Sequence, residues 1–426
     1  MKQLTMQKPI GLQLHRYLPV FNSGPPKLVN TIQRLVWNTG LWSNQSLGLH
    51  WLAKLSIVCF FSTNFTQFAA MIIERDDSER VFECFSVLSF CGMGALKLVN
   101  LYFNRERWLF MLSQVTLLEN RQMDGASDKQ ALEYDSDDEE ECLSPHIERY
   151  TRKHTVTSNL LLTLYSATAV IFIVTPFVEY ALQKNSETYP HILPGWAPLD
   201  AVGFLGYFVS VLFEVVGSIY CVFVHVAFDC TSVGIMIFIC GQFSMLRHST
   251  ENIGGRGLDC RLSAARDARA RLRIAKTHGT HIILCNVMNE LEAALRGILG
   301  VYFLVATLTV CSVAVRINSH TLSFMQLVSL LQYMCGTLTQ LFLFCRYGDA
   351  VFHESSFSMG EGPFGAAWWG LHPRVRRELA MLGAAMAKPR ALRAGPFNTL
   401  DLPSFVQIVR AAYSYYAVLG QTSKNT

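Results

Sequence analysis

Residues 399–422, TLDLPSFVQIVRAAYSYYAVLGQT, form the stretch that decides the fold. This stretch is just long enough to cross a bilayer as a helix, which takes about 20 residues. It is not a uniformly apolar anchor, because Arg410, Ser414 and Gln421 interrupt it. Polar groups that meet lipid without a partner are costly, so at least one side of this helix should face protein or water.

One face of this segment has a distinctive composition. At helical spacing, Ala411, Ser414, Val418 and Thr422 fall on the same side. Small and polar residues with one apolar ring are typical of a pore lining, where the apolar ring can block ions. Small residues also allow close contact between two helices, and the residues alone leave that alternative open.

The composition of the whole chain indicates a membrane protein. Of its 426 residues, 51% are hydrophobic and only 16% are charged, against about 25% charged residues in average soluble proteins. Several apolar runs reach spanning length, which predicts an all-α polytopic fold. The first forty residues lack a short apolar core followed by a small-residue cleavage site, so we expect no cleavable signal peptide.

Loop charges predict the orientation. Residues 1–50 contain basic residues and no acidic ones, which places the N-terminus in the cytoplasm. The basic cluster that follows residue 243 also belongs inside. The long apolar run at 200–243 therefore has to cross once, as one long fourth helix that continues into the cytoplasm. Seven transmembrane helices result, with the C-terminus outside the cell.

The predicted organisation alternates membrane helices with cytoplasmic segments. Its boundaries are 1–54 for a cytoplasmic N-terminal segment, 55–243 for transmembrane helices 1–4 with an acidic cytoplasmic loop at 104–157, 244–290 for a basic cytoplasmic segment, 291–345 for helices 5 and 6, 346–398 for a cytoplasmic anchor segment, 399–422 for helix 7 and 423–426 for an extracellular tail.

Four local features carry expectations of their own. The acidic run at 135–141 should be disordered. Lys97, near the inner end of the second span, should extend to the headgroups. The external loop at 181–198 contains three prolines and Trp196, which favour an ordered, lid-like turn. Residues 372–394 have the pattern of an amphipathic helix that lies on the headgroups or packs on the other cytoplasmic helices.

Several short blocks in the C-terminal third resemble the insect odorant receptor family. In order, they are QLFLFCRYGD at 340–349, Glu354-Ser355, Phe364, Trp368, Lys388-Pro389, AGPF at 394–397 and AYSYYAVL at 412–419. Each block is weak alone, but their shared order and spacing are specific. The inverted seven-helix topology is also similar over the whole chain. The long insertion between the fourth and fifth helices of the family's co-receptor is absent, so the chain resembles an odour-tuning subunit.

This resemblance implies a ligand-gated, non-selective cation channel. The family assembles as a tetramer with the odorant receptor co-receptor in the plasma membrane of olfactory sensory neuron dendrites. The cytoplasmic ends of helices four to seven would form an anchor, and the seventh helices would line one pore with Val418 at its apolar gate. The predicted pore and gate residues are Ala411, Ser414, Val418, Gln421 and Thr422.

The resemblance also implies that a small volatile binds in the outer half of the bundle formed by helices two, three, four and six. No motif identifies the individual pocket residues, so candidates follow from depth in the membrane. They are Phe82, Phe85, Ile171, Thr175, Phe204, Tyr207, Phe208, Phe324 and Met325. An apolar, aromatic cavity would bind volatiles largely by desolvation. Aromatic residues in membrane helices also serve simply for packing, and that alternative stays open for each of them.

Other functions fit the residues less well. His278 and His281 lack cysteine or carboxylate partners at ligand spacing, so no metal site is predicted. The sequence shows no nucleophile–base pair, phosphate-binding loop or paired carboxylates, so we predict no enzyme, no cofactor and no nucleic-acid partner. The nearest alternative is a gustatory-type channel of the same superfamily, although its usual C-terminal motif is absent. A G-protein-coupled receptor would need the reverse orientation, and a secondary transporter should show internal repeats.

Overall fold

The computed structural model describes residues 28–37, 39, 47–76, 78–130, 144–182, 189–255, 262–317, 324–356, 359–396 and 398–422. Most of these residues are helical, in α1 (Leu28–Trp37), α2 (Leu47–Ile73), α3 (Ser78–Phe103), α4 (Arg105–Gln130), α5 (Ser144–Leu182), η2 (Pro198–Val202), α6 (Phe204–Glu251), α7 (Ala264–Ile317), α8 (Phe324–Ser356), α9 (Glu361–Gly365), η3 (Trp368–Gly370), α10 (Pro373–Met386) and α11 (Leu402–Thr422). Two short antiparallel strands, β1 (Arg393–Ala394) and β2 (Asn398–Thr399), precede α11.

Six of the described helices are long and apolar enough to cross a membrane, namely α2, α3, α5, α6, α7 and α8. The predicted all-α polytopic membrane fold is therefore confirmed. α11 has 21 residues but is not among these six. Gln407, Arg410 and a group of tyrosines make it less apolar, so its role as a seventh span stays a prediction.

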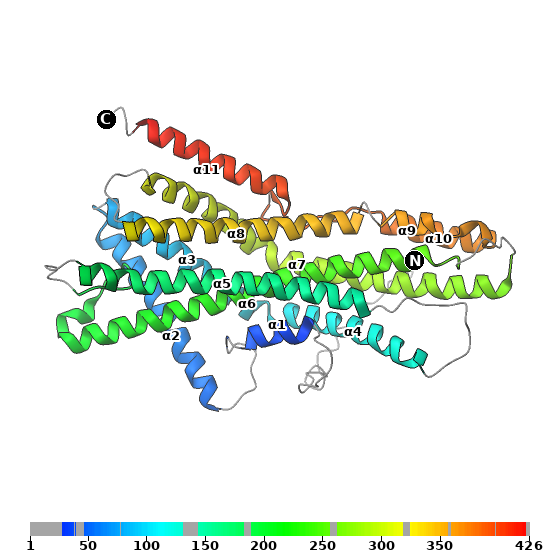
Figure 1. Cartoon of the computed structure of the whole chain (residues 1–426), viewed down its shortest axis with the longest axis horizontal. Helices are drawn as coiled ribbons and strands as arrows, with labels where there is room; N and C mark the ends of the chain where they lie inside the picture. Colours follow the sequence, from blue (N-terminus) through cyan, green and yellow to red (C-terminus); the bar gives the residue numbers. More distant parts are fainter. Residues whose placement is uncertain are drawn as a thin grey trace, which may run out of the picture.

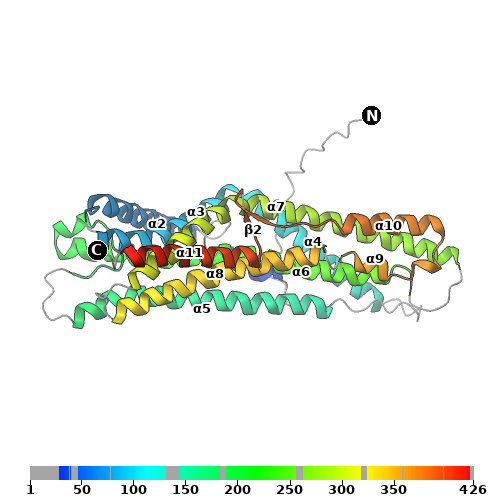
Figure 2. The ribbon, with the colours of Figure 1, turned by 90° about the horizontal axis from the view of Figure 1, so that it is seen from above.

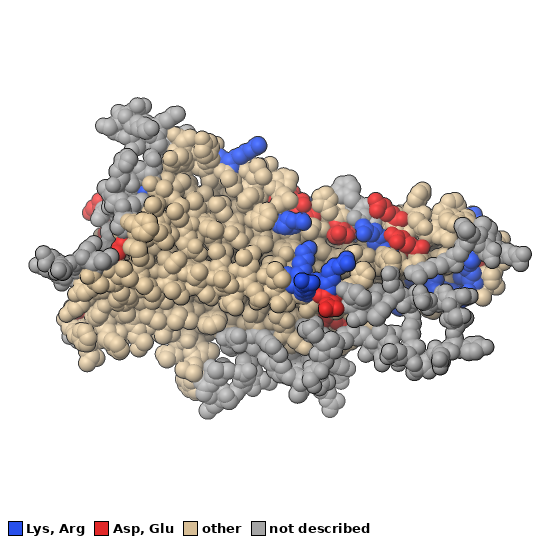
Figure 3. Space-filling view, in the orientation of Figure 1, with Lys and Arg blue, Asp and Glu red and all other residues tan. Residues whose placement is uncertain are grey.

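The longest helices extend well beyond a bilayer. α6 has 48 residues, which corresponds to a length of about 70 Å at 1.5 Å per residue, whereas the hydrocarbon core measures about 30 Å. In the face shown in Figure 3, charged side chains are sparse over one half of the molecule and gather over the half that holds α9 and α10. The apolar half is the part that fits a bilayer. The single helix over 204–251 agrees with the prediction of one long fourth helix.

α6 is the central helix of the bundle, packed against α1, α2, α3, α5, α7, α8 and α9. Residues 224–239 are all buried, as expected for a helical segment that is surrounded by protein. Figures 1 and 2 show α5, α7 and α8 running beside it in roughly the same direction, whereas α2 is inclined to them in Figure 1. This core holds the apolar half and the charged half together as one continuous bundle.

The segment before α11 is fixed tightly to α7. The backbone N–H of Gly395 donates to the carbonyl of Arg296 at 2.7 Å, and Nε of Arg296 donates back to the Gly395 carbonyl at 3.1 Å. Gly395 has a φ of 72°, a left-handed conformation that favours glycine. Asp401 then caps α11 by accepting from the backbone N–H of Ser404 at 2.9 Å. This docking sets the position from which α11 starts.

The structure differs from the sequence predictions at Lys97, at the end of α10 and in the loop at 104–157. Lys97 does not extend to the headgroups; it is 2% exposed inside the bundle, because Asp229 on α6 provides a buried partner. α10 ends at Met386, earlier than predicted, because the approach to Pro389 breaks the helix. Within the predicted loop at 104–157, residues 105–130 form α4, whose Trp108 is buried against Phe228. The acidic run at 135–141 lies outside the described residues.

Candidate functional site

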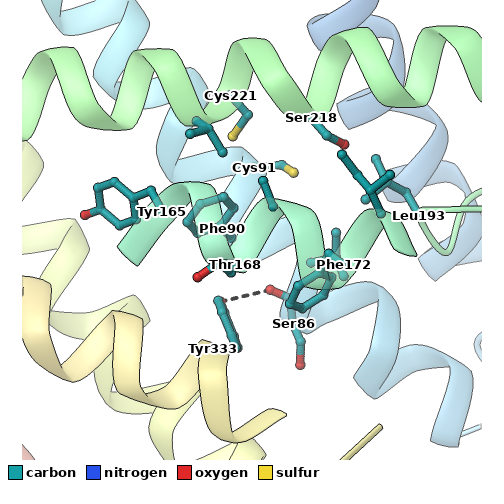
Figure 4. Close-up of a pocket in the computed structure, with 14 residues that line it drawn as sticks. Ser86, Phe90, Cys91, Tyr165, Thr168, Phe172, Leu193, Ser218, Cys221 and Tyr333 are labelled. Atoms are coloured by element: carbon teal, nitrogen blue, oxygen red, sulfur yellow. Dashed lines mark hydrogen bonds between the residues drawn. The ribbon is translucent and has the colours of Figure 1, made fainter. Parts of the chain in front are cut away.

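A small cavity lies between four helices in the apolar half of the bundle (Figure 4). Its lining residues come from α3, α5, α6 and α8 and from the loop between α5 and η2: Ser86, Val87, Phe90, Cys91, Tyr165, Thr168, Ala169, Phe172, Ile173, Leu193, Ser218, Cys221, Val222 and Tyr333. The volume open to the centre of a water-sized sphere is about 50 Å³, where one water needs roughly 10 to 15 Å³. None of these lining residues carries a charge at neutral pH.

Most polar groups of this lining are bonded within the protein. The Tyr333 hydroxyl donates to the backbone carbonyl of Ser86 at 3.0 Å. Thr168 donates to the Leu164 carbonyl at 2.8 Å and accepts from Gln332 at 3.3 Å. These bonds hold α3, α5 and α8 in register around the cavity and leave its surface mainly apolar.

The loop at 189–197 covers one end of the cavity, where it contributes Leu193. Glu214 on α6 fixes this loop, because Oε2 accepts from the backbone N–H groups of Ile192 and Leu193 at 2.9 and 3.4 Å. The backbone N–H of Trp196 donates to the carbonyl of Thr66 on α2 at 3.1 Å. The described part of the loop is therefore an ordered cover, in agreement with the lid-like turn predicted from its prolines.

His191 adds an ionic clamp to this cover. Its Nδ1 lies 2.9 Å from Oε1 of Glu214, and its Nε2 lies 2.7 Å from Oδ2 of Asp200. Hydrogen bonding to Glu214, with further support from Asp200, raises the pKa of His191 to about 9. The imidazolium form is thus the form that donates from both ring nitrogens at neutral pH.

A buried network of charged and polar side chains adjoins the cavity. Lys97 on α3 donates to both carboxylate oxygens of Asp229 and to Nδ1 of His225 at 2.8 Å. The Tyr165 hydroxyl, whose ring lines the cavity, donates to Asp229 at 2.6 Å. Phe90 stacks on the His225 ring with centroids 4.2 Å apart. Two lining residues, Tyr165 and Phe90, therefore contact the network directly.

α11 lies along α7 and α8 at the edge of the bundle (Figure 1). Its inner face packs through Ile408 and Ala412, which are buried. Gln407, Arg410 and Ser414 are exposed. These three residues follow helical spacing, so the free face of α11 has a polar stripe. At membrane depth such a stripe needs protein or water against it rather than lipid.

Two of the five predicted pore residues, Ala411 and Ser414, have described side chains. Ser414 is exposed and Ala411 is half-buried. α11 extends through Val418, Gln421 and Thr422, but the side chains of these three residues lie outside the described part. The structure contains one chain, and the pore itself stays a prediction.

The eight predicted pocket residues whose side chains are described do not line this cavity. Ile171, Phe85 and Met325 are half-buried. Thr175 is buried and bonds Ser329 on α8 at 3.3 Å. Tyr207 donates to the carbonyl of Pro190 at 2.9 Å and so supports the loop. Phe204, Phe208 and Phe324 are exposed on the surface of the apolar half, and the side chain of Phe82 lies outside the described part.

The sequence analysis did not identify the lining residues Phe90, Tyr165 and Ser218, nor the clamp. The helices that form the cavity have apolar residues all around their circumference. The periodicity of apolar residues therefore does not show which face of each helix points into the cavity. One signal was available. Lys97, Asp229 and Glu214 are charged residues in or next to apolar runs, and such residues usually pair with one another inside a membrane protein.

Comparison with known proteins agrees with this architecture, that of a polytopic, all-helical membrane protein. The fold is similar to that of the insect olfactory receptor OR5 from Machilis hrabei, solved alone and in complex with eugenol. The TM-scores are 0.72 and 0.71, at 13% and 14% sequence identity, and each match covers 92% of this chain and 97% of that receptor.

The sequence profile described as 7tm Odorant receptor matches residues 77–413. The chain therefore belongs to the odorant receptor family. Odorant receptor 22c of Drosophila melanogaster is 28% identical over 276 residues, which is 62% of this chain. Odorant receptor 13a of the same fly is 23% identical over 286 residues, or 63% of this chain. Both matches span 66% of the relative's own length. The odorant receptor coreceptor of Anopheles gambiae is 27% identical over 94 residues, 22% of this chain and 20% of that one.

Proposed function

We propose that this chain is the odour-tuning subunit of a ligand-gated, non-selective cation channel. A small volatile binds in the cavity between α3, α5, α6 and α8, and its binding opens a pore lined by α11. The observation that carries the proposal is the covered, uncharged cavity, whose lining is built for a small apolar molecule. Its four helices are those that the family resemblance assigns to the ligand.

α8 provides a physical connection from the cavity to α11. Tyr333 lines the cavity, and Phe342 on the same helix packs edge-on against Phe405 of α11 with centroids 5.6 Å apart. A ligand changes the channel only if it binds one helix arrangement better than the other. In this proposal the outer bundle tightens around the ligand and moves the outer end of α11 away from the pore axis. The apolar ring at Val418 then widens and fills with water.

The exposed polar stripe of α11 supports a multimeric pore. A tetramer with the co-receptor brings the α11 helices of its subunits together around water, which satisfies Arg410 and Gln407 without exposing them to lipid. In this assembly the chain lies in the plasma membrane of olfactory sensory neuron dendrites, with a cytoplasmic N-terminus and an extracellular C-terminus.

The proposal is tested by expressing the chain with and without an insect co-receptor in a cell that lacks both. A panel of volatiles, which includes eugenol because the solved relative binds it, is applied while whole-cell current is recorded. We expect a volatile-evoked cation current that needs both subunits and differs from that of the co-receptor alone. A surface-expressed pair that responds to no volatile contradicts the proposal.

Orientation provides an independent test against a G-protein-coupled receptor. An epitope tag at the C-terminus should be accessible to antibody on intact cells, whereas a tag at the N-terminus should need permeabilisation. The reverse pattern contradicts the channel topology.

A further inference from the structure

Ser218 has a property that the other polar residues of the cavity lack. Its hydroxyl oxygen is buried and has no hydrogen-bond partner among the described residues. Serine in a helix usually donates to the carbonyl four residues earlier. Ser232 on the same helix does so, with its hydroxyl 2.8 Å from the carbonyl of Phe228. Ser218 makes no such bond, and Figure 4 shows its hydroxyl turned toward the other lining residues.

The remaining hydroxyls of the cavity are already occupied. Those of Tyr333, Thr168 and Tyr165 donate to protein acceptors at 3.0, 2.8 and 2.6 Å, and Ser86 also has a partner within the protein. The thiols of Cys91 and Cys221 are weak hydrogen-bonding groups. Ser218 is therefore the strong polar group of this lining that remains free to bond a ligand.

We propose that Ser218 recognises the ligand, and that the ligand is a small uncharged volatile with one oxygen on an apolar body, such as an alcohol, phenol, aldehyde, ketone or ester. This inference rests on the proposed function and adds the chemical class of the ligand. A buried hydroxyl that finds no partner in the complex costs binding affinity. A hydrocarbon leaves Ser218 unpaired, whereas an oxygen-bearing analogue of the same shape pairs with it.

Charge narrows the class further. The lining contains no charged residue at neutral pH, and the ionic groups next to it are paired, Lys97 with Asp229 and Glu214 with His191. A carboxylate or an ammonium ligand would enter this cavity without a counter-charge, which is strongly unfavourable. The cavity thus selects neutral oxygenated molecules over acids and amines.

The test compares volatiles that share a carbon skeleton. The chain is expressed with the co-receptor, and currents are recorded for toluene, benzyl alcohol, benzaldehyde, benzoate and benzylamine, and for hexane, 1-hexanol, hexanal and hexanoate. In at least one skeleton, the oxygenated neutral member should reach its half-maximal response at a concentration about tenfold or more below that of the hydrocarbon. The charged members should be the weakest.

Ser218→Ala should reduce this preference to about threefold or less, mainly by weakening the oxygenated ligand. Ser218→Cys keeps the size of the side chain and should fall between the two. Ser232→Ala removes a serine of the same helix that is already bonded and lies outside the lining, so the ratio between oxygenated and hydrocarbon ligands should stay near the wild-type value. Ser249→Ala, on the exposed cytoplasmic part of α6, serves as the control for expression and should not alter any response.

The outcomes separate the two proposals. If the wild-type channel opens to hydrocarbons and their alcohols alike, or if Ser218→Ala keeps the full preference, the assignment of Ser218 is wrong while the channel function stands. The comparison within the wild-type protein needs no variant, so a folding defect in Ser218→Ala leaves the test decisive. A surface-expressed channel that opens to none of the panel overturns the proposed function and the ligand class together.

Discussion

The ammonium nitrogen of Lys97 lies 2.7 Å and 2.8 Å from the two carboxylate oxygens of Asp229, and the two side chains are 2% and 1% exposed. Asp229 also accepts from Tyr165 on α5 and from Gln340 on α8. One buried carboxylate therefore joins α3, α5, α6 and α8, the same four helices that surround the cavity. Burial of both charges is tolerated because their hydrogen-bonding capacity is largely satisfied.

Removing one member of this pair should lower the stability of the folded protein far more than removing both. Lys97→Met leaves a buried carboxylate without its counter-charge, for which we expect a loss of about 3 to 5 kcal/mol of stability. The double change Lys97→Met with Asp229→Leu should recover most of that loss, because no buried charge remains. Thermal midpoints of the detergent-solubilised protein, measured by its elution as a monodisperse peak after heating, provide the comparison.

Lys54→Met is the matched control for this pair, because Lys54 is an exposed lysine on α2. It should change the midpoint little. If the single Lys97→Met variant is as stable as wild type, the pair does not contribute the stability proposed for it.

The clamp on the cavity cover should respond to external pH. The pKa of His191 is raised from its ordinary value of 6.5 to about 9 in the folded protein. A raised pKa stabilises the folded form fully below the ordinary pKa, and the contribution is lost as pH rises through the folded value. Stability of the cover should thus decrease between about pH 7 and pH 10, and ligand affinity should fall with it.

Dose–response curves at external pH 7, 8, 9 and 10, with internal pH held constant, measure this effect. The glutamine in His191→Gln cannot titrate. The ligand affinity of this variant should therefore be lower than that of wild type at pH 7, and loss of the clamp should not lower it further as pH rises. His248→Gln, which changes a histidine near the C-terminal end of α6, far along the helix from the cover, should keep the wild-type pH dependence. Parallel curves for wild type and His191→Gln would exclude the clamp as the source.

The sequence predicted the class of fold and the helices of the cavity better than it predicted individual residues. Apolar length identified the six spans of the described part. The single helix over 204–251 agrees with the one long helix predicted for the apolar run at 200–243, while the orientation taken from loop charge stays a prediction. Both signals are sums over many residues, so single errors have little effect. The motif blocks identified the family for the same reason.

The cavity residues were harder because they depend on how each helix is rotated about its axis. Ile171 was predicted and Phe172 lines the cavity; the two are one position, or about 100°, apart. A helix that meets protein on one side and lipid on the other has apolar residues on both, so the sequence does not define that rotation. Lys97 was predicted to reach the headgroups because its partner, Asp229, is 132 residues away in the sequence and no local signal joins them.

The close approach of α7 to the segment before α11 should be sensitive to one methyl group. A Cβ added to Gly300 would lie 2.7 Å from the Cα of Gly395, which is too close for either backbone to stay in place. Gly300→Ala should lower the thermal midpoint and disturb the start of α11, and so change basal or evoked current. Gly297 lies on the same helix, with nothing within 4 Å of an added Cβ. Gly297→Ala should be neutral or slightly stabilising. Equal behaviour of the two variants would contradict the tight docking.

The pore assignment makes a prediction about basal current. Val418→Ser replaces the proposed apolar ring with hydroxyl groups, and a polar ring fills with water more readily than an apolar one. We expect a higher current in the absence of any volatile, together with altered ion selectivity, in cells that also express the co-receptor. Val409→Ser is the control, because a position nine residues earlier falls on the opposite side of α11; it should leave the basal current low. If Val418→Ser changes neither basal current nor selectivity, α11 does not line the gate at this position.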